Sequence, residues 1–163
     1  MLLKGSCHCQ SVRFTCESKH PVPYQRCYCT ICRKTSGGGG FVINIEADAT
    51  TLEVVGKEHC SVYQASGQRE GKTVTSNHER HFCSKCGSHL WAWNSNWPEL
   101  LHPVAGAIDS ELPTPPAHVH LMLEPASRAN WVAVEGKDGD AHFQQYPEES
   151  LADWHKKRQL DCD

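Results

Sequence analysis

Clustered cysteines are the residues of this sequence best suited to chemistry. Ten of its 163 residues are cysteine, and seven of the ten fall into three short groups. The groups are Cys7-x-Cys9, Cys27-x-Cys29-x-x-Cys32 and Cys83-x-x-Cys86. Thiolates at such spacings commonly bind zinc. Cysteine is about 6% of the chain, below the roughly 8–10% of short secreted disulfide scaffolds, so metal binding is favoured over a disulfide framework.

Seven thiols divide naturally into a group of four and a group of three, which predicts two zinc ions per chain. Four thiolates form a closed, tetrahedral, structural site, whereas three leave a fourth position open for water or a substrate. The spacing leaves open which groups share an ion. Cys29 and Cys32 could join Cys83 and Cys86, which would leave Cys7, Cys9 and Cys27 as the group of three.

The positions of the cysteines suggest how each group closes around an ion. Two cysteines separated by one residue lie on the same side of an extended segment, so both sulfur atoms can face one metal. Cys83-Ser-Lys-Cys86-Gly87 has the form of a zinc-knuckle turn, in which Gly87 permits a positive φ. We therefore expect the cysteine groups at strand ends and in loops.

Short apolar runs separated by turn residues carry these groups and predict a mainly β fold. The expected strands cover Ser11–Cys16, Phe41–Glu46, Leu52–Val55, Ser61–Ala65, Val74–Asn77, His89–Trp93, Val104–Ala107, Val119–Leu123 and Trp131–Val134. One helix is expected over Glu148–Gln159, with Leu151, Trp154 and Arg158 on one face. We predict a single zinc-stabilised β domain over residues 3–146 and a helical C-terminal tail over residues 147–163.

Composition and charge exclude several classes of protein. A net charge of −3 and a pI near 6.4 give no general attraction to phosphate backbones, so we expect no nucleic-acid partner. The first residues, Met-Leu-Leu-Lys-Gly, become polar too early for a signal peptide, and no run is long enough to span a membrane. These observations predict a location in the reducing cytoplasm. They leave the oligomeric state open.

Four stretches of the chain together resemble one known family. They are KGSCHCQSVRF at Lys4–Phe14, CYCTICRKTSGG at Cys27–Gly38, FCSKCGSHL at Phe82–Leu90 and VAGAID at Val104–Asp109. This order of motifs resembles the glutathione-dependent formaldehyde-activating enzyme (Gfa) family, which also includes centromere protein V. The resemblance extends through His118 to Trp131. Two details depart from the family pattern: Gln10 stands where glycine is usual, and Thr30 where serine is usual.

The resemblance implies both a ligand assignment and an activity. Its closed structural zinc site would consist of Cys7, Cys9, Cys83 and Cys86, and its open catalytic site of Cys27, Cys29 and Cys32. The implied reaction is that of a carbon–sulfur lyase, which forms or breaks an adduct between a thiol such as glutathione and a small aldehyde such as formaldehyde. The alternative is a non-catalytic, zinc-stabilised protein-interaction domain.

Several residues near the open site are candidates for contacts with the thiol substrate. Arg33 and Lys34 could offset the charge of three thiolates or bind the carboxylates of glutathione, or they could be solvated surface cations. Gly37 and Gly38 begin a run of four glycines whose backbone N–H groups could approach a peptide-like ligand. That run could equally be a simple linker.

The sequence gives less specific predictions for several other polar and aromatic residues. His118 and His120 alternate along an expected strand and so share a face; His118 also matches a position of the family. Both are more often structural than proton-transferring. Trp91, Trp93 and Trp97 are expected in packing or in a pocket wall. The isolated Cys16, Cys60 and Cys162 are expected to be ordinary apolar or surface residues.

Overall fold

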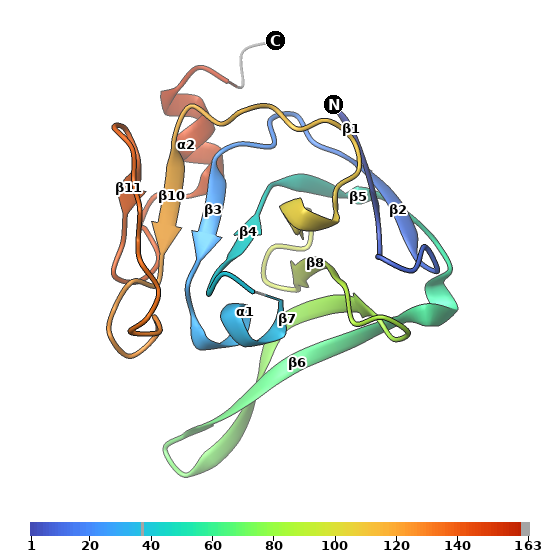
Figure 1. Ribbon diagram of the computed structural model, residues 1–163, viewed down its shortest axis with the longest axis horizontal. Helices are drawn as coiled ribbons and strands as arrows, with labels where there is room; N and C mark the ends of the chain where they lie inside the picture. Colours follow the sequence, from blue (N-terminus) through green and yellow to red (C-terminus); the bar gives the residue numbers. More distant parts are fainter. Residues whose placement is uncertain (37, 161–163) are drawn as a thin grey trace. The chain divides into compact units, whose positions relative to one another are not determined.

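The structure is a computed structural model that describes residues 1–36 and 38–160 (Figure 1). Its internal contacts divide the chain into two compact units, each built from two separate stretches. Unit 1 contains Met1–Pro21 and Ile43–Thr114, and unit 2 contains Val22–Val42 and Pro115–Asp163. The division into units does not test the predicted domain boundaries, so the domain over residues 3–146 stays a prediction.

Unit 1 is built on an antiparallel sheet of seven strands. In sheet order these are β1 (Leu2–Ser6), β2 (Arg13–Glu17), β5 (Ala47–Val55), β9 (Leu100–Pro103), β8 (His89–Asn94), β7 (Lys72–Cys83) and β6 (Cys60–Arg69). Two short 3₁₀ turns, η1 (Lys57–His59) and η2 (Ala105–Ala107), connect strands. The core includes Leu3, Val12, Phe14, Ile45, Leu90, Trp91 and Leu101. The Phe14 and Trp91 rings meet edge to face, with centroids 5.0 Å apart.

The β6–β7 hairpin continues past the end of its neighbour in the sheet. Pairing between β7 and β8 ends at His78 opposite Asn94, whereas β6 and β7 remain paired as far as Arg69 opposite Lys72 (Figure 1). The connecting residues Glu70 and Gly71 both have positive φ, at 51° and 75°. Positive φ at both central residues is the geometry that matches the twist of a two-residue hairpin.

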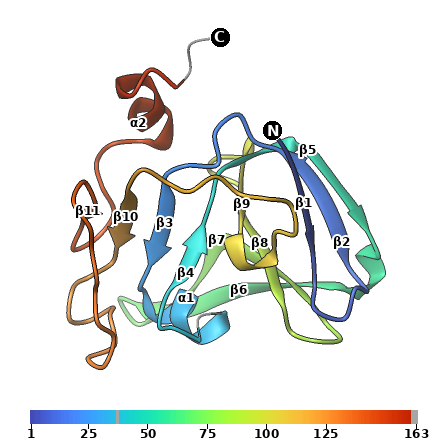
Figure 2. The same ribbon diagram turned by 45° about the horizontal axis from the view of Figure 1, so that its top comes forward.

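Unit 2 holds a second sheet of four strands and two helices (Figure 2). The sheet order is β11 (Ala141–His142), β10 (His118–Leu121), β3 (Tyr24–Cys27) and β4 (Val42–Asn44), and the unit boundary falls within β4. β10 pairs in parallel with both β3 and β11. Helix α1 (Thr30–Thr35) follows β3 directly. The core consists of Tyr28, Leu123, Ala129 and Val132, with Phe41 and Val134 packed against it.

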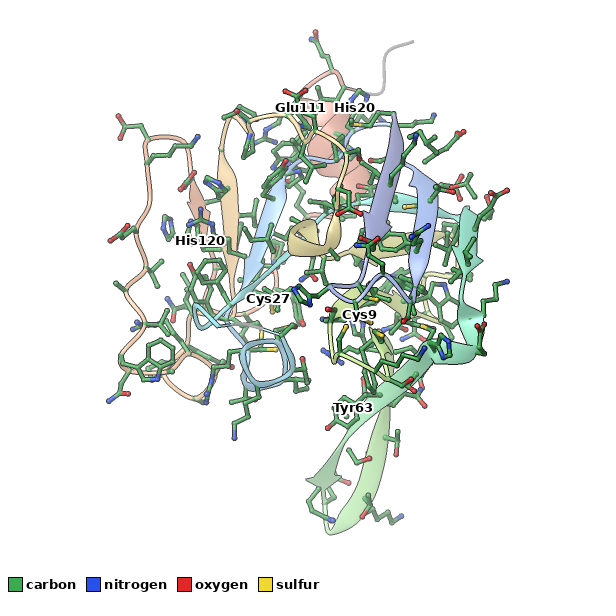
Figure 3. The ribbon with its side chains drawn as sticks, turned by 45° about the vertical axis from the view of Figure 1, so that its right-hand side comes forward. Cys9, His20, Cys27, Tyr63, Glu111 and His120 are labelled. Atoms are coloured by element: carbon green, nitrogen blue, oxygen red, sulfur yellow. The ribbon has the colours of Figure 1, made fainter. Side chains whose placement is uncertain are left out.

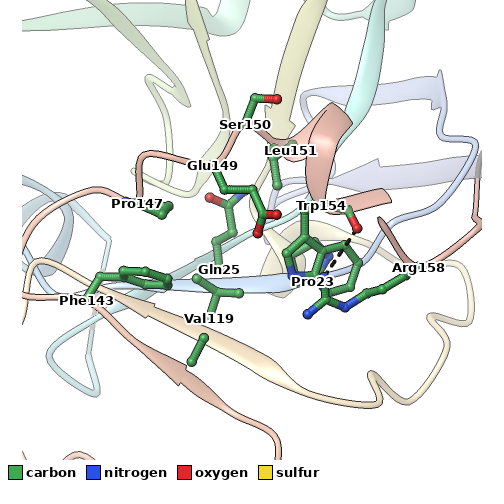
Figure 4. A pocket seen from close by; sticks show the side chains of 11 residues that line it. Pro23, Gln25, Val119, Phe143, Pro147, Glu149, Ser150, Leu151, Trp154 and Arg158 are labelled. Atoms are coloured by element: carbon green, nitrogen blue, oxygen red, sulfur yellow. Dashed lines mark hydrogen bonds between the residues drawn. The ribbon is translucent and has the colours of Figure 1, made fainter. Parts of the chain in front are cut away.

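Helix α2 (Leu151–Lys157) is the last helix of the described chain and belongs to unit 2. The Ser150 hydroxyl caps it by accepting a hydrogen bond from the Asp153 N–H at 3.0 Å. Trp154 is buried, and the guanidinium of Arg158 lies 4.0 Å from the centre of its ring. A cavity of about 90 Å³ lies beside the helix, lined by Pro23, Phe143, Glu149 and Trp154 among others (Figure 4).

The prediction of a mainly β fold with a short C-terminal helix is confirmed. Two predicted strands are wrong: Val104–Ala107 becomes a single β-bridge at Val104 followed by η2, and Trp131–Val134 is irregular. The strands β1, β3, β9 and β11 and the helix α1 were not predicted from the sequence. No helix among the described residues combines the length and the apolar character that crossing a bilayer requires.

Candidate metal centres

The first thiol group brings Cys7, Cys9, Cys83 and Cys86 together in unit 1, with all four sulfur atoms within 4.8 Å of one another. Cys7 and Cys9 lie in the loop between β1 and β2, where Figure 3 labels Cys9. Cys83 ends β7, and Cys86 lies in the turn that follows. Cys29 and Cys32 are not among the thiols gathered here.

The sulfur separations fit a tetrahedral zinc ion. Zinc–sulfur bonds of about 2.3 Å place the sulfur atoms of a tetrahedron about 3.8 Å apart. The Sγ atoms of Cys9 and Cys83 are 3.8 Å apart, and those of Cys7 and Cys9 are 3.6 Å apart. Cys7 and Cys83 are completely buried, whereas Cys9 and Cys86 are exposed. Both the donor set and its spacing match a closed structural site.

Two similar turns shape this group. Gly87 has a φ of 75° and donates its N–H to the Cys83 carbonyl at 2.8 Å, as the knuckle reading of the sequence predicted. In the other loop Gln10 has a φ of 61° and donates its N–H to the Cys7 carbonyl at 2.9 Å. The Gln10 side chain also donates to Ser6 Oγ at 2.9 Å. This hydrogen bond supports a left-handed conformation at a position where the family usually has glycine.

Local hydrogen bonds and burial make the four thiols unequal. The hydroxyl of Ser88, 3.2 Å from the Cys86 sulfur, lowers the pKa of Cys86 to about 5. Hydrogen bonds between Cys9 and Ser11 lower the pKa of Cys9. Burial raises the pKa of Cys83 to about 11. Cys9 and Cys86 therefore lose their protons more readily than Cys83, and the deprotonated thiolate is the form that binds a metal ion.

The second thiol group consists of Cys27, Cys29 and Cys32, all in unit 2 and all buried. Cys27 is the last residue of β3 (labelled in Figure 3), and Cys29 is the N-cap of α1. The Cys29 sulfur accepts a hydrogen bond from the Cys32 N–H at 3.3 Å. Short as it is, α1 thus serves to turn Cys32 back toward Cys29. Among the described residues, no fourth Cys, His, Asp or Glu joins this group.

The pKa values of Cys27 and Cys29 shift in opposite directions. Hydrogen bonds from the Cys27 and Cys32 side chains lower the pKa of Cys29, and backbone N–H groups of α1 add to the effect. The same hydrogen bonds to Cys29 and Cys32, together with burial, raise the pKa of Cys27. Cys29 therefore loses its proton more readily than Cys27. The set matches the donors of an open zinc site, because three thiolates leave one tetrahedral position.

The cations that follow this group lie in different surroundings. Both Arg33 and Lys34 are in the last turn of α1. Lys34 is exposed, whereas Arg33 is half-buried. The Nε atom of Arg33 is buried and has no hydrogen-bond partner among the residues that the structure describes. A buried side-chain N–H without a partner is rare in folded proteins, so this one needs an acceptor that the described residues do not supply.

The glycine run behind α1 divides by structure. Gly37 lies outside the described residues. Gly38 is exposed, and a Cβ added there would meet no atom within 4 Å. Gly40 has a φ of 86°, and a Cβ added there would lie 2.2 Å from Val132 Cγ2. The fold therefore requires glycine at position 40 and leaves position 38 open to a role in binding.

None of the remaining histidine and cysteine candidates that the structure describes is a member of either thiol group. His118 and His120 share a face of β10 as predicted, and both contact the buried Asp140 carboxylate, which the sequence did not single out. Trp91 and Trp93 line a groove of about 350 Å³ in unit 1, and none of the residues lining it is a cysteine. Cys16 is a core residue and Cys60 is half-buried, while Cys162 lies outside the described residues.

Comparisons with known proteins agree with the resemblance seen in the sequence. The family model described as glutathione-dependent formaldehyde-activating enzyme matches residues 2–123. A protein of Halomonas elongata named "Putative glutathione-dependent formaldehyde-activating enzyme" is 55% identical over 161 residues, which cover 99% of each chain. The crystal structure of a Rhodobacter sphaeroides protein, 28% identical, superposes with a TM-score of 0.53 and covers 68% of this chain and 91% of its own.

Proposed function

Because this chain belongs to the glutathione-dependent formaldehyde-activating enzyme family, we propose that it is a zinc-dependent carbon–sulfur lyase acting on glutathione and formaldehyde. The observation that carries the proposal is the second thiol group. Three buried sulfurs converge there, and no fourth donor joins them among the described residues. The first group, with four sulfurs, is assigned to a structural zinc ion.

The proposed reaction joins a thiol to an aldehyde without any redox change. The thiol sulfur attacks the carbonyl carbon of formaldehyde, so a carbon–sulfur bond forms as the carbonyl π bond breaks. The thiol proton ends on the former carbonyl oxygen, which gives S-(hydroxymethyl)glutathione. The reverse reaction breaks the carbon–sulfur bond and returns both reactants.

Each participant has a separate task at the second group. A zinc ion held by Cys27, Cys29 and Cys32 would supply a Lewis acid that binds the substrate sulfur and lowers its pKa. Burial of the three ligands keeps water away from one side of the reacting sulfur. Arg33, whose Nε–H has no partner among the described residues, would donate to a glutathione carboxylate, with Lys34 as a second, solvated cation. Holding the thiol and the aldehyde together lowers the entropic part of the barrier.

The test must measure a rate, because glutathione and formaldehyde also condense without a catalyst. Exchange NMR at equilibrium measures the interconversion of glutathione and its hydroxymethyl adduct directly. Wild-type protein should raise the exchange rate, and Cys29→Ser should return it to the background rate. Cys60→Ser is the matched control, because Cys60 belongs to neither thiol group. Its exchange rate should equal that of the wild type.

Two results would count against the proposal in different ways. If glutathione changes the absorption of the cobalt-substituted protein but exchange stays at background, the protein binds thiols and acts on another substrate. If neither changes, the interaction-domain alternative is favoured. A cytoplasmic location is part of the proposal, since all nine described cysteines are free thiols.

A further inference from the structure

A buried chain of hydrogen bonds ends on the residue between two cysteines of the second thiol group. Tyr28 lies between Cys27 and Cys29, and its hydroxyl is 2.9 Å from His120 Nδ1. His120 Nε2 is in turn 3.3 Å from Asp140 Oδ2. Tyr28 is 1% exposed, His120 0% and the Asp140 side chain 1%, so all three hydrogen-bonded side chains are removed from water. All three residues belong to unit 2.

The hydrogen bonds of Asp140 fix the direction of this chain. Burial opposes its ionisation, but N–H groups of His118 and Lys137 donate to the carboxylate at 2.7 and 3.0 Å. Together with the bond from His120 they hold the pKa of Asp140 below its usual range. An ionised carboxylate only accepts, so His120 Nε2 donates to it. Burial lowers the pKa of His120, so its ring carries a single N–H; Nδ1 is then the acceptor, and the Tyr28 hydroxyl donates.

Packing leaves the rings of this chain little freedom. The His142 ring stacks on the His120 ring with centroids 4.5 Å apart and an interplanar angle of 5°. The Tyr28 ring lies against Phe41, with centroids 5.1 Å apart. The Tyr28 N–H also donates to the Leu121 carbonyl at 3.1 Å. Tyr28 is thus fixed at its backbone, at its ring and at its hydroxyl.

We propose that Asp140 and His120 are positioning residues that hold Tyr28, and through it the Cys27-Tyr28-Cys29 segment, in the geometry that binds zinc. This inference rests on the proposed zinc ion of the second group, but not on the reaction proposed for it. Packing alone would be met by phenylalanine at position 28. A hydroxyl directed to one acceptor additionally selects a single orientation of the segment, as buried polar contacts can do when every partner is satisfied.

The consequence is a specific loss of metal affinity when the chain of hydrogen bonds is cut. Groups that orient metal ligands commonly change metal affinity by about 10- to 100-fold when they are replaced. Tyr28→Phe removes only the hydroxyl and keeps the ring, and Asp140→Asn removes the charge that orients His120. Each should weaken zinc binding at the second group about 10-fold or more and leave the first group unchanged.

The measurement is a zinc-chelator titration of the full chain, in which the two ions leave in separate steps. Cys29→Ser identifies the step that belongs to the second group. Tyr63→Phe and Asp138→Asn serve as matched controls, because both side chains are exposed. Both controls should titrate like wild type. Asp140→Asn added to Tyr28→Phe should weaken zinc binding little further, because both changes interrupt the same series of hydrogen bonds.

Three results would overturn the inference. The first is Tyr28→Phe protein that holds both zinc ions as tightly as wild type. The second is an equal weakening of both ions together with a lower melting temperature, which would indicate general destabilisation. The third is wild-type protein with no zinc at the second group, which would remove the proposed function as well. The two proposals can also fail separately. If Tyr28→Phe weakens zinc binding as expected but wild-type protein does not raise the glutathione exchange rate above background, the reaction is refuted and the positioning role is supported.

Discussion

Arg33 and Lys34 follow Cys32 directly. Within the described part of the chain Arg33, unlike the exposed Lys34, has a buried side-chain N–H without a hydrogen-bond partner. If Arg33 binds a carboxylate of glutathione, Arg33→Gln should raise the glutathione concentration needed for half-maximal exchange by about 10- to 100-fold. That size follows from the roughly 1.5–3 kcal/mol of a hydrogen bond to a charged group. Lys34→Gln is the matched control and should change it little, since an exposed cation contributes little. Exchange NMR over a glutathione series measures both variants.

Equal effects of the two substitutions would contradict this assignment. They would indicate that the cations act only through their summed charge near three thiolates. An increase of ionic strength separates the cases, because salt screens exposed charges more than half-buried ones.

Some residues of the candidate site could be predicted from the sequence alone, and others could not. The cysteine groups were visible because metal ligands require particular spacings, and Gly87 marked its own turn through the positive φ that such a turn needs. Asp140 was not visible. It lies between lysine-, aspartate- and glycine-rich neighbours, and only the pairing of β10 with β11 brings it to His120.

At the scale of elements, the connection between α1 and β4 depends on one glycine of the run. Gly40→Ala should destabilise the protein by more than about 1 kcal/mol, because φ is positive and the new methyl group would overlap Val132. Gly38→Ala is the matched control in the same run. Its Cβ meets no atom within 4 Å, so the melting temperature should stay the same or rise slightly. Thermal melts of both proteins decide the matter; similar losses would contradict the overlap.

The elements that the sequence did not reveal share a physical reason. β3 is four residues long and pairs with β10, which lies more than ninety residues further along the chain, so no local pattern signals it. α1 has six residues, too few for helical periodicity, and it begins at a cysteine rather than at a usual capping residue. The apolar run at Trp131–Val134 suggested a strand, yet only Val132 is buried there while Trp131 is 66% exposed.

At the scale of the whole molecule, the two thiol groups should differ in what their loss does. Protein purified without chelator should contain two zinc ions by mass-spectrometric metal analysis. Cys83→Ser should lose most of its stability, because structural zinc contributes on the order of 10 kcal/mol in small zinc domains. Cys29→Ser should stay folded with one zinc ion. Circular dichroism melts and metal content of both variants, with Cys60→Ser as the control, measure this difference.

The opposite pattern would reverse the assignment. If Cys83→Ser melts like wild type while Cys29→Ser unfolds, the structural ion belongs to the group in unit 2. A reproducible content of one zinc ion, with the cysteines still reduced, would leave only one of the two groups as a metal site.

The two thiol groups span very different lengths of sequence, which has a consequence during protein synthesis. Cys27, Cys29 and Cys32 lie within six consecutive residues, whereas the other group needs Cys86, 54 residues after Cys32. At about 5–20 residues per second, a ribosome takes several seconds to make that interval. The second group therefore has all its donors early, while the first closes only after most of the unit 1 strands exist. Zinc therefore meets the three thiols of the second group first, but His120 and Asp140, which are proposed to hold that segment, are made only after Cys86.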